Sequence, residues 1–262
     1  MICIKIFWAL LAIFFSKFGN GEEFRIIGGR KATTLEFPYQ VELEMTYMHM
    51  CGGSIISNNF ILTAAHCVKS VENYKKYPAY PATVFRLRVG ADSTSKGGVI
   101  YNVEKVICHE KYREEVPKDQ FDIALVKTTE PIKFTDNIKP IELVSKEPSE
   151  GDMAYVTGYG REQIMRSGML ANHLMAVELP VVGLKKCKKK LKGVANDMIC
   201  AGFEKGNKDA CVGDSGGPMA VNNKLAGVVA WGKGCGQEGV PGVYTNVAHY
   251  RKWIDTHMKE NS

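Results

Sequence analysis

Short apolar runs, several of them alternating with polar residues, recur along most of the chain and are separated by turn residues. Each run has the length of a β-strand, and Gly, Pro, Asn and Asp occupy the gaps between runs. Spacing of this kind favours an all-β sandwich or barrel. The clearest runs are 41–45, 60–64, 84–89, 123–126 and 225–231.

One helix is predicted, at the C-terminal end of the chain. Its apolar and aromatic residues recur every three or four positions between polar neighbours, which places them on one face of a helix. They are Tyr250, Trp253, Ile254, His257 and Met258.

The first residues have the layout of a secretory signal peptide. Lys5 is followed by an apolar run at 6–15 and then by small residues up to Gly21. The run is too short to cross a bilayer, and no later segment approaches the roughly 20 apolar residues that a membrane helix needs. We therefore expect a signal peptide over about residues 1–21 and a secreted, extracellular protein with no membrane partner.

A segment rich in proline, serine and charge, residues 138–151, divides the rest of the chain into nearly equal halves. Such composition is typical of a linker between domains. We predict an N-terminal unit over 26–138, a C-terminal unit over 139–262 and a linker near 139–151.

The composition is that of a globular protein, with 45% hydrophobic residues and a formal net charge of +6. Lysines gather around Cys187, but no aromatic residues interleave them and no nucleic-acid motif accompanies them, so we expect no nucleic-acid partner. A solvated helix face explains the cluster best, and weak binding of polyanions is the alternative. The lysines are Lys185, Lys186, Lys188, Lys189, Lys190 and Lys192.

Three residues carry candidate chemistry. Ser215 lies in the run 213–218, whose glycines permit a tight backbone. A serine needs a base to become a nucleophile, and the base needs a group that holds its tautomer and offsets its charge. His66 closes an apolar run beside a cysteine. Asp122 is embedded among residues that favour burial, so it should have a dedicated hydrogen-bonding partner. Each residue also fits a purely structural role when taken singly.

The glycines around Ser215 also fit the Gly-X-Ser-X-Gly elbow of α/β-hydrolases, which would make the protein an esterase. That fold requires a helix after the serine, then an acid and a histidine downstream. Here two glycines, a proline and a predicted strand follow, and Glu238 is the only carboxylate before His249. We therefore reject the esterase.

Taken together, His66, Asp122, Ser215 and their flanks resemble the trypsin-like serine proteases of the chymotrypsin family, in which the chain order is His, Asp, Ser. The resemblance runs from Ile26 to the terminal helix. It implies two antiparallel six-stranded β-barrels, with the active site in the cleft between them and a C-terminal α-helix. Residues 26–262 would then form one peptidase S1-type domain. We expect a monomer that needs no cofactor, cuts protein and peptide substrates and binds proteinaceous serine protease inhibitors.

The resemblance also implies an acyl-enzyme mechanism. Ser215 would attack the scissile carbonyl, His66 would take and return the proton, and Asp122 would orient and stabilise the imidazolium. The backbone N–H groups of Gly213 and Ser215 would bind the oxyanion. The alternative is an inactive homologue that acts as a binding or regulatory module. Such proteins usually lack a residue of the triad, and all three residues are present here.

Activation is implied at the bond between Arg25 and Ile26, where a basic residue precedes an apolar N-terminus. In the family that the chain resembles, the freed ammonium of the residue at Ile26 pairs with the acid at Asp214 and forms the oxyanion hole and the substrate pocket. We therefore expect an activation propeptide over 22–25 and a zymogen. Because Arg25 is itself a trypsin-type cleavage site, the enzyme could activate itself.

Substrate choice is implied by Asp209, six residues before Ser215, where trypsin-like proteases keep the carboxylate at the bottom of the primary pocket. Gly232 and Gly242 match wall positions that must stay small. A buried carboxylate in a narrow slot selects a cation, so Arg or Lys is expected at the cleaved position. Ala210, where a serine is common, would favour Arg. The other residues expected to contact substrate are Val212, Ala230 and Trp231.

Of the eight cysteines, Cys3 lies in the predicted signal peptide, which leaves an odd number. Cys108 has no evident partner, and we expect a buried free thiol there, with an intermolecular bridge as the alternative. The resemblance implies the pairs Cys51 with Cys67, Cys187 with Cys200, and Cys211 with Cys235.

The sequence departs from the family pattern in two places. Ala230 replaces a serine that usually donates a hydrogen bond to the buried aspartate, so we expect lowered activity. The stretch 68–89 is longer than in digestive trypsins, and it either overhangs the cleft or is an inert surface loop. The loop after Gly90 also lacks the carboxylates that bind calcium in some relatives, so we expect no required metal.

Overall fold

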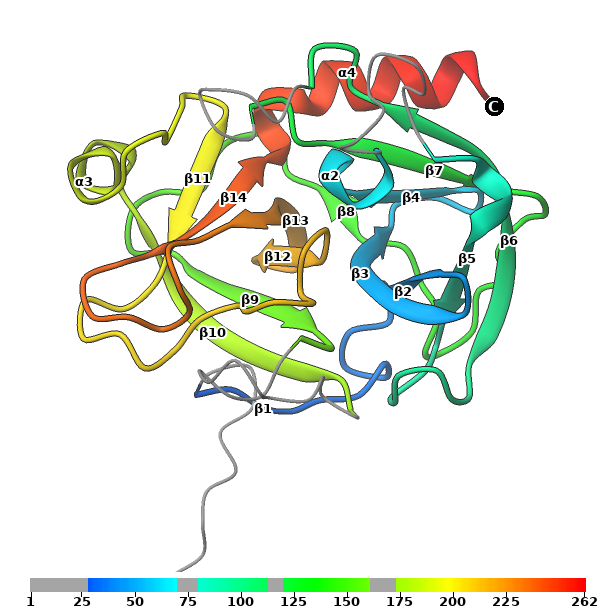
Figure 1. The fold of residues 1–262 in the computed structure, drawn as a ribbon, viewed down its shortest axis with the longest axis horizontal. Helices are drawn as coiled ribbons and strands as arrows, with labels where there is room; N and C mark the ends of the chain where they lie inside the picture. Colours follow the sequence, from blue (N-terminus) through cyan, green and yellow to red (C-terminus); the bar gives the residue numbers. More distant parts are fainter. Residues whose placement is uncertain (1–27, 70–79, 113–119, 161–172) are drawn as a thin grey trace, which may run out of the picture.

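The apolar runs of the N-terminal half form a closed barrel of antiparallel strands (Figure 1). The computed structural model describes residues 28–69, 80–112, 120–160 and 173–262. Around the barrel the strand order is β2-β3-β4-β7-β6-β5, and β5 pairs with β2 to close the ring. The strands are β2 (Gln40–Met45), β3 (Met48–Ile55), β4 (Phe60–Thr63), β5 (Phe85–Val89), β6 (Val99–Cys108) and β7 (Ala124–Thr128).

The C-terminal half forms a second ring of six antiparallel strands, in the order β9-β10-β11-β14-β13-β12, closed by pairing of β12 with β9. Two short strands extend it: β1 (Arg30–Lys31) pairs with β10, and β8 (Glu142–Leu143) pairs in parallel with β13. The predicted pair of six-stranded barrels is therefore confirmed. The ring strands are β9 (Met153–Gly158), β10 (Met175–Val182), β11 (Met198–Ala201), β12 (Pro218–Val221), β13 (Lys224–Trp231) and β14 (Gly242–Asn246).

The predicted C-terminal helix is present as α4 (Val247–Glu260), which buries Val247, Tyr250 and Ile254. The side chain of Asn246 caps it by accepting from the backbone N–H of His249 at 3.3 Å. From the second barrel α4 runs across the first (Figure 1). None of the described helices has the length and apolar character that a membrane span requires. The other helical segments are α2 (Ala65–Val68), η2 (Ala82–Val84) and α3 (Leu184–Lys190).

Strand β2 differs from the simple pattern of one apolar and one polar face, because its polar residues are buried as well. Glu44 accepts from Arg88 Nε at 2.7 Å and also pairs with Arg86. Glu42 accepts from the backbone N–H of Ser95 at 3.0 Å. Partners supplied by distant segments thus offset the cost of burying these carboxylates.

The two barrels share one hydrophobic core, which includes residues of β2 and β4 from the first barrel and of β9 and β13 from the second. A buried hydrogen bond from Thr157 Oγ1 to Gln40 Oε1, 2.6 Å long, also joins them. The strands of the first ring end at Thr128 and those of the second begin at Met153. The division at 138 and 139 into two units stays a prediction.

Candidate active site

His66 and Asp122 meet because their strands are neighbours. β4 and β7 are antiparallel, with Thr63 opposite Ala124, so the residues that follow β4 lie beside those that precede β7. The backbone N–H of His66 donates to Asp122 Oδ1 at 2.9 Å, and His66 Nδ1 lies 2.7 Å from Asp122 Oδ2. Asp122 is fully buried, and Thr245 Oγ1 donates to its carbonyl at 2.8 Å. This carboxylate fixes the imidazole so that Nδ1 carries a proton and Nε2 is available as a base.

The segment that carries Ser215 packs against the same part of the first barrel. The backbone N–H of Gly52 donates to the carbonyl of Ser215 at 2.7 Å. A Cβ atom on Gly216, whose φ is 77°, would lie 2.2 Å from Thr63 Oγ1 and 3.2 Å from Cys67 Sγ. Only glycine permits this approach. Since Cys67 Sγ is 3.7 Å from His66 Nε2, the Ser215 segment lies in the immediate neighbourhood of His66.

Three disulfides join described cysteines in the pairs that the resemblance implies, and two of them, Cys51–Cys67 and Cys211–Cys235, lie beside the site. Cys51 and Cys67 lie within ligand distance of His66, but they are bonded to each other and so offer no thiolates to a metal ion. Cys108 is a free, partly buried cysteine, and burial raises the pKa of its thiol to about 11.

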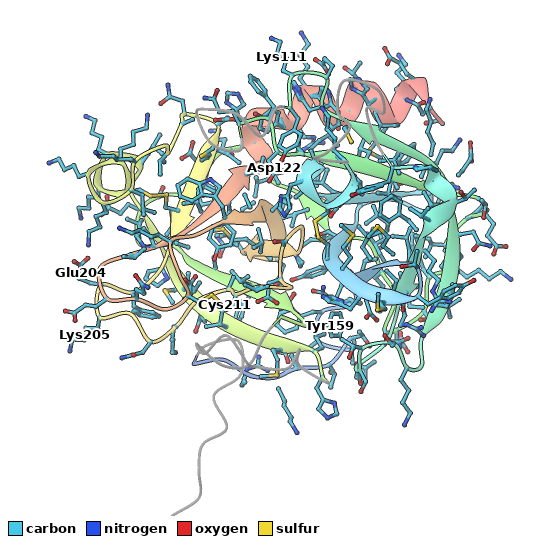
Figure 2. The ribbon with its side chains drawn as sticks, viewed as in Figure 1. Lys111, Asp122, Tyr159, Glu204, Lys205 and Cys211 are labelled. Atoms are coloured by element: carbon cyan, nitrogen blue, oxygen red, sulfur yellow. A yellow bond between two sulfur atoms is a disulfide. The ribbon has the colours of Figure 1, made fainter. Side chains whose placement is uncertain are left out.

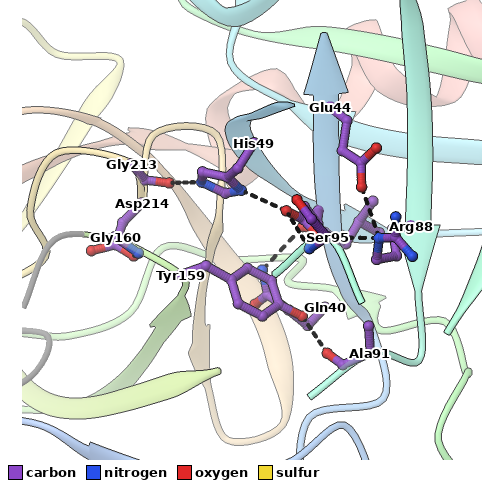
Figure 3. Close-up of polar contacts among 12 residues, drawn as sticks. Gln40, Glu44, His49, Arg88, Ala91, Ser95, Tyr159, Gly160, Gly213 and Asp214 are labelled. Atoms are coloured by element: carbon purple, nitrogen blue, oxygen red, sulfur yellow. Dashed lines mark hydrogen bonds and ion pairs between the residues drawn. The ribbon is translucent and has the colours of Figure 1, made fainter. Parts of the chain in front are cut away.

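Asp214 is fully buried inside the turn before Ser215. Its Oδ1 accepts from the backbone N–H of Gly160 and its Oδ2 from that of Cys211, both at 2.8 Å. Burial nevertheless raises the pKa of Asp214 to about 6. Next to it, His49 Nε2 lies 2.9 Å from the carbonyl oxygen of Gly213 (Figure 3). These contacts determine the backbone conformation from Gly213 to Ser215.

A cavity of about 270 Å³ opens beside Ser215, with Asp209 in its wall. Asp209 is 4% exposed. Its Oδ2 accepts from the backbone N–H of Gly236 at 3.0 Å, whereas Oδ1 is buried with no partner among the described residues. Burial raises the pKa of Asp209 to about 7. The other predicted contact residues also line this cavity: Ala210, Val212, Ala230, Trp231, Gly232 and Gly242.

Tyr244 also lines the cavity, and the sequence interpretation missed it. Its hydroxyl is buried and, within the described ranges, has no hydrogen-bond partner. A Cβ on Gly242 would lie 2.8 Å from Asp209 Oδ1 and 3.1 Å from the Tyr244 hydroxyl, so both polar groups converge where glycine leaves room. The sequence signal that could have found Tyr244 is its position two residues after Gly242, because residues two apart on a strand lie on the same face. Two unpartnered oxygens in a small cavity suit a ligand that carries several N–H donors.

Several predicted features lie outside the described residues. These are the signal peptide, the propeptide, Arg25, Ile26, and positions 70–79 of the stretch 68–89. At Ala230 the expected donor is missing, yet both oxygens of the Asp122 carboxylate have a partner in His66. In the lysine cluster, Lys186 pairs with Glu150 and Lys190 with Glu204. Polyanion binding by the cluster stays a prediction.

Comparison with known proteins agrees with this geometry. The family model described as Trypsin matches residues 26–254. Trypsin 5G1 of Aedes aegypti is 39% identical over 236 residues, which are 88% of this chain and 84% of that protein. Trypsin epsilon of Drosophila erecta is 37% identical over 90% of this chain and 88% of its own length. Hypodermin-A of Hypoderma lineatum is 39% identical over 88% and 86%.

Proposed function

Since this chain belongs to the trypsin family of serine endopeptidases, we propose that it is a secreted enzyme, made as an inactive precursor, that hydrolyses peptide bonds after arginine or lysine. The names of the relatives support the trypsin-like activity, and the layout of the first residues supports secretion. Proteinaceous serine protease inhibitors are the expected regulators.

The proposed reaction proceeds through an acyl-enzyme. Ser215 Oγ bonds to the scissile carbonyl carbon while His66 Nε2 takes its proton, and the N–H groups of Gly213 and Ser215 stabilise the oxyanion. The C–N bond then breaks as His66 returns the proton to the leaving amine. Water, activated by the same nitrogen, hydrolyses the ester. The bonds from His66 to Asp122 support this assignment, because the carboxylate stabilises the imidazolium in both steps.

One observation carries the proposed substrate specificity: Asp209 Oδ1, in the cavity beside Ser215, is buried and has no hydrogen-bond partner among the residues that the structure describes. A buried carboxylate without a partner is unfavourable, and the charge of an arginine or lysine side chain removes that cost. Gly232 and Gly242 leave the space that such a long side chain needs.

Activation is proposed to occur at the Arg25–Ile26 bond. Asp214 is buried, and in the described part of the chain its hydrogen-bond donors are backbone N–H groups, which supports a role for the freed ammonium of Ile26 as its counter-charge. The pair would hold Gly213 and Ser215 in the conformation that binds the oxyanion.

The test compares the form that begins at Ile26 with the uncleaved precursor. We expect the cleaved form to hydrolyse arginine and lysine amides much faster than a matched leucine amide, with all turnover blocked by a serine-directed organophosphonate. Ser215→Ala is the matched inactive control. The uncleaved precursor carrying Arg25→Gln should remain inactive. A cleaved form without inhibitor-sensitive turnover would instead favour the inactive homologue.

A further inference from the structure

Phe121, the residue before Asp122, has a backbone conformation that aromatic residues rarely adopt. Its φ is 60°, in the left-handed region, where a bulky side chain is strained. Such strain persists only where surrounding contacts hold the residue, and it is common beside functional groups. The contacts of Phe121 therefore bear on how Asp122 is placed.

Stacked rings hold the side chain of Phe121. Its ring stacks on His109, with 4.9 Å between centroids and 30° between planes, and His109 stacks on Trp253 of α4 at 5.2 Å and 24°. Tyr250 of α4 packs edge-on against both Phe121 and His109. Figure 2 shows α4 close to the labelled Asp122. Burial lowers the pKa of His109, which favours the neutral form of the middle ring of the stack. Contacts of this geometry stabilise aromatic pairs beyond simple burial.

The backbone of Phe121 is tied to the second barrel. Its N–H donates to Asp197 Oδ2 at 3.2 Å, and the hydroxyl of Tyr250 donates to the same oxygen. Its carbonyl accepts from the N–H of Ile123 at 2.8 Å, so the chain bends tightly around Asp122. The direction of the Asp122 carboxylate therefore depends on the conformation of Phe121.

We propose that Phe121 is a positioning residue. Its ring, held by His109 and Trp253, keeps the backbone in the left-handed conformation that directs the Asp122 carboxylate to His66. This role rests on the proposed function, in which His66 is the base and Asp122 its partner. Without the stack, the backbone would relax to negative φ and withdraw the carboxylate from the imidazole.

Two substitutions separate positioning from packing. Phe121→Ala removes the ring, and because alanine also disfavours positive φ, the backbone is no longer held there and relaxes. We expect kcat to fall about tenfold, and KM to stay unchanged because the pocket is untouched. Phe121→Gly removes the ring and the strain together, since glycine adopts positive φ freely. Its kcat should stay within about threefold of the original. The smaller residue therefore retains the higher rate, the reverse of what lost packing predicts.

Tyr47 provides the matched control. It is also an aromatic residue at positive φ, 71°, with Arg86 4.3 Å from its ring centroid, but it lies in the turn between β2 and β3. Tyr47→Ala and Tyr47→Gly should leave kcat unchanged. Each kcat is calculated per active site, and the active sites are counted by titration with the organophosphonate, so that misfolded protein does not lower the measured kcat. If Phe121→Ala does not fold, Phe121→Leu replaces it, because a bulky side chain also disfavours positive φ, and its kcat should fall in the same way; Phe121→Asn, which tolerates positive φ, should match Phe121→Gly.

A second readout follows the His66–Asp122 bond directly. The downfield proton resonance of His66 Nδ1–H should persist in Phe121→Gly and shift or broaden in Phe121→Ala. An unchanged kcat in Phe121→Ala, or a kcat in Phe121→Gly as low as that of Phe121→Ala, would overturn the proposal. Asp122→Asn is the reference: full activity there would overturn the proposed function too, whereas a large loss there with normal Phe121 variants would overturn positioning alone.

Discussion

The His66–Asp122 pair and the cavity beside Ser215 each contain a buried aspartate, but the two carboxylates differ in what satisfies them. Both oxygens of Asp122 accept hydrogen bonds from His66 within the protein. Asp209 Oδ2 accepts from a backbone N–H, whereas Oδ1 has no hydrogen-bond partner in the described part of the chain. The first carboxylate is complete before substrate arrives, and the second is not.

This difference assigns the two carboxylates different tasks. A buried carboxylate with a hydrogen-bond partner on each oxygen can orient a neighbour and offset its charge without the help of a ligand. A carboxylate kept partly unsatisfied in a small cavity favours whatever brings a positive charge to it. Changes at Asp122 should therefore act on the rate of every substrate, and changes at Asp209 on the choice between substrates.

The largest effect is expected from Asp122→Asn. An amide donates where the carboxylate accepts, so His66 is held in the wrong tautomer and Nε2 can no longer take the proton of Ser215. For triads of this type the loss in kcat is about 10⁴-fold. Steady-state kinetics on arginine and lysine amides should show equal losses for both, with little change in KM. A loss confined to one substrate would contradict the division of tasks.

Asp209→Ser should change selectivity instead. Removing one partner of a buried charge pair costs about 2–5 kcal/mol, so kcat/KM for arginine and lysine amides should fall by about 10³-fold. The rate on a leucine amide should not fall, because His66 and Asp122 are untouched. Measurement of kcat/KM on the three amides decides this, and an unchanged preference for arginine would show that another group binds the cation.

The stability of the same variant gives an independent check. The pKa of Asp209 in the folded protein, about 7, lies above the ordinary value, so the native carboxyl keeps a proton that the unfolded chain has lost. Between about pH 4 and pH 7 the original protein should therefore lose stability as pH rises, relative to Asp209→Ser. Denaturant unfolding of both proteins at several pH values would reveal this difference. Asp214 titrates in both proteins, and its repulsion with Asp209 is the part of its contribution that differs between them.

The affinity of the cavity for a cation should also depend on pH through the ionisation of Asp209, with a smaller effect than that of the substitutions above. A small aryl amidine needs the ionised form of Asp209, so its affinity should rise about tenfold from pH 6 to pH 8 and then level off. Below pH 7 each binding event should release a proton. Calorimetry in two buffers of different ionisation enthalpy measures this release, and Asp209→Ser is the control. Binding independent of pH would mean that Asp209 is already ionised in the empty cavity.

The strands and both aspartates could be predicted from the sequence, but not all of their surroundings could. Apolar runs predicted strands of both barrels because these strands are buried along most of their length. They could not predict that Glu42 and Glu44 would be buried, since the arginines and backbone groups that satisfy them come from distant segments. The resemblance proposed Asp209 from its register to Ser215. It did not reveal that Tyr244 would share the cavity, because that depends on how β14 is placed.

The backbone before Asp122 is a second case that sequence reasoning could not reach. Nothing in the local sequence requires Phe121 to adopt positive φ, and propensity argues against it. The conformation depends on the ring of His109 after β6, the rings of α4 and the carboxylate of Asp197 before β11, which only the assembled fold brings together. Predictions from local sequence propensity are expected to fail at strained positions of this kind.

The smallest effects should come from adding one hydroxyl at either carboxylate. Ala230→Ser restores the donor usual beside the buried aspartate, and we expect kcat to rise about two- to fivefold, equally for arginine and lysine amides.

Ala210→Ser makes the same chemical change in the cavity beside Ser215. Because its hydroxyl would contact the substrate cation, it should leave kcat near its original value and lower the arginine-to-lysine ratio of kcat/KM by about threefold. If Ala230→Ser altered that ratio, or Ala210→Ser raised the rate on both substrates equally, the two carboxylates would not have separate tasks. Both oxygens of Asp122 already have partners in His66, so the gain from Ala230→Ser also measures how much a third donor adds to a carboxylate that is already satisfied.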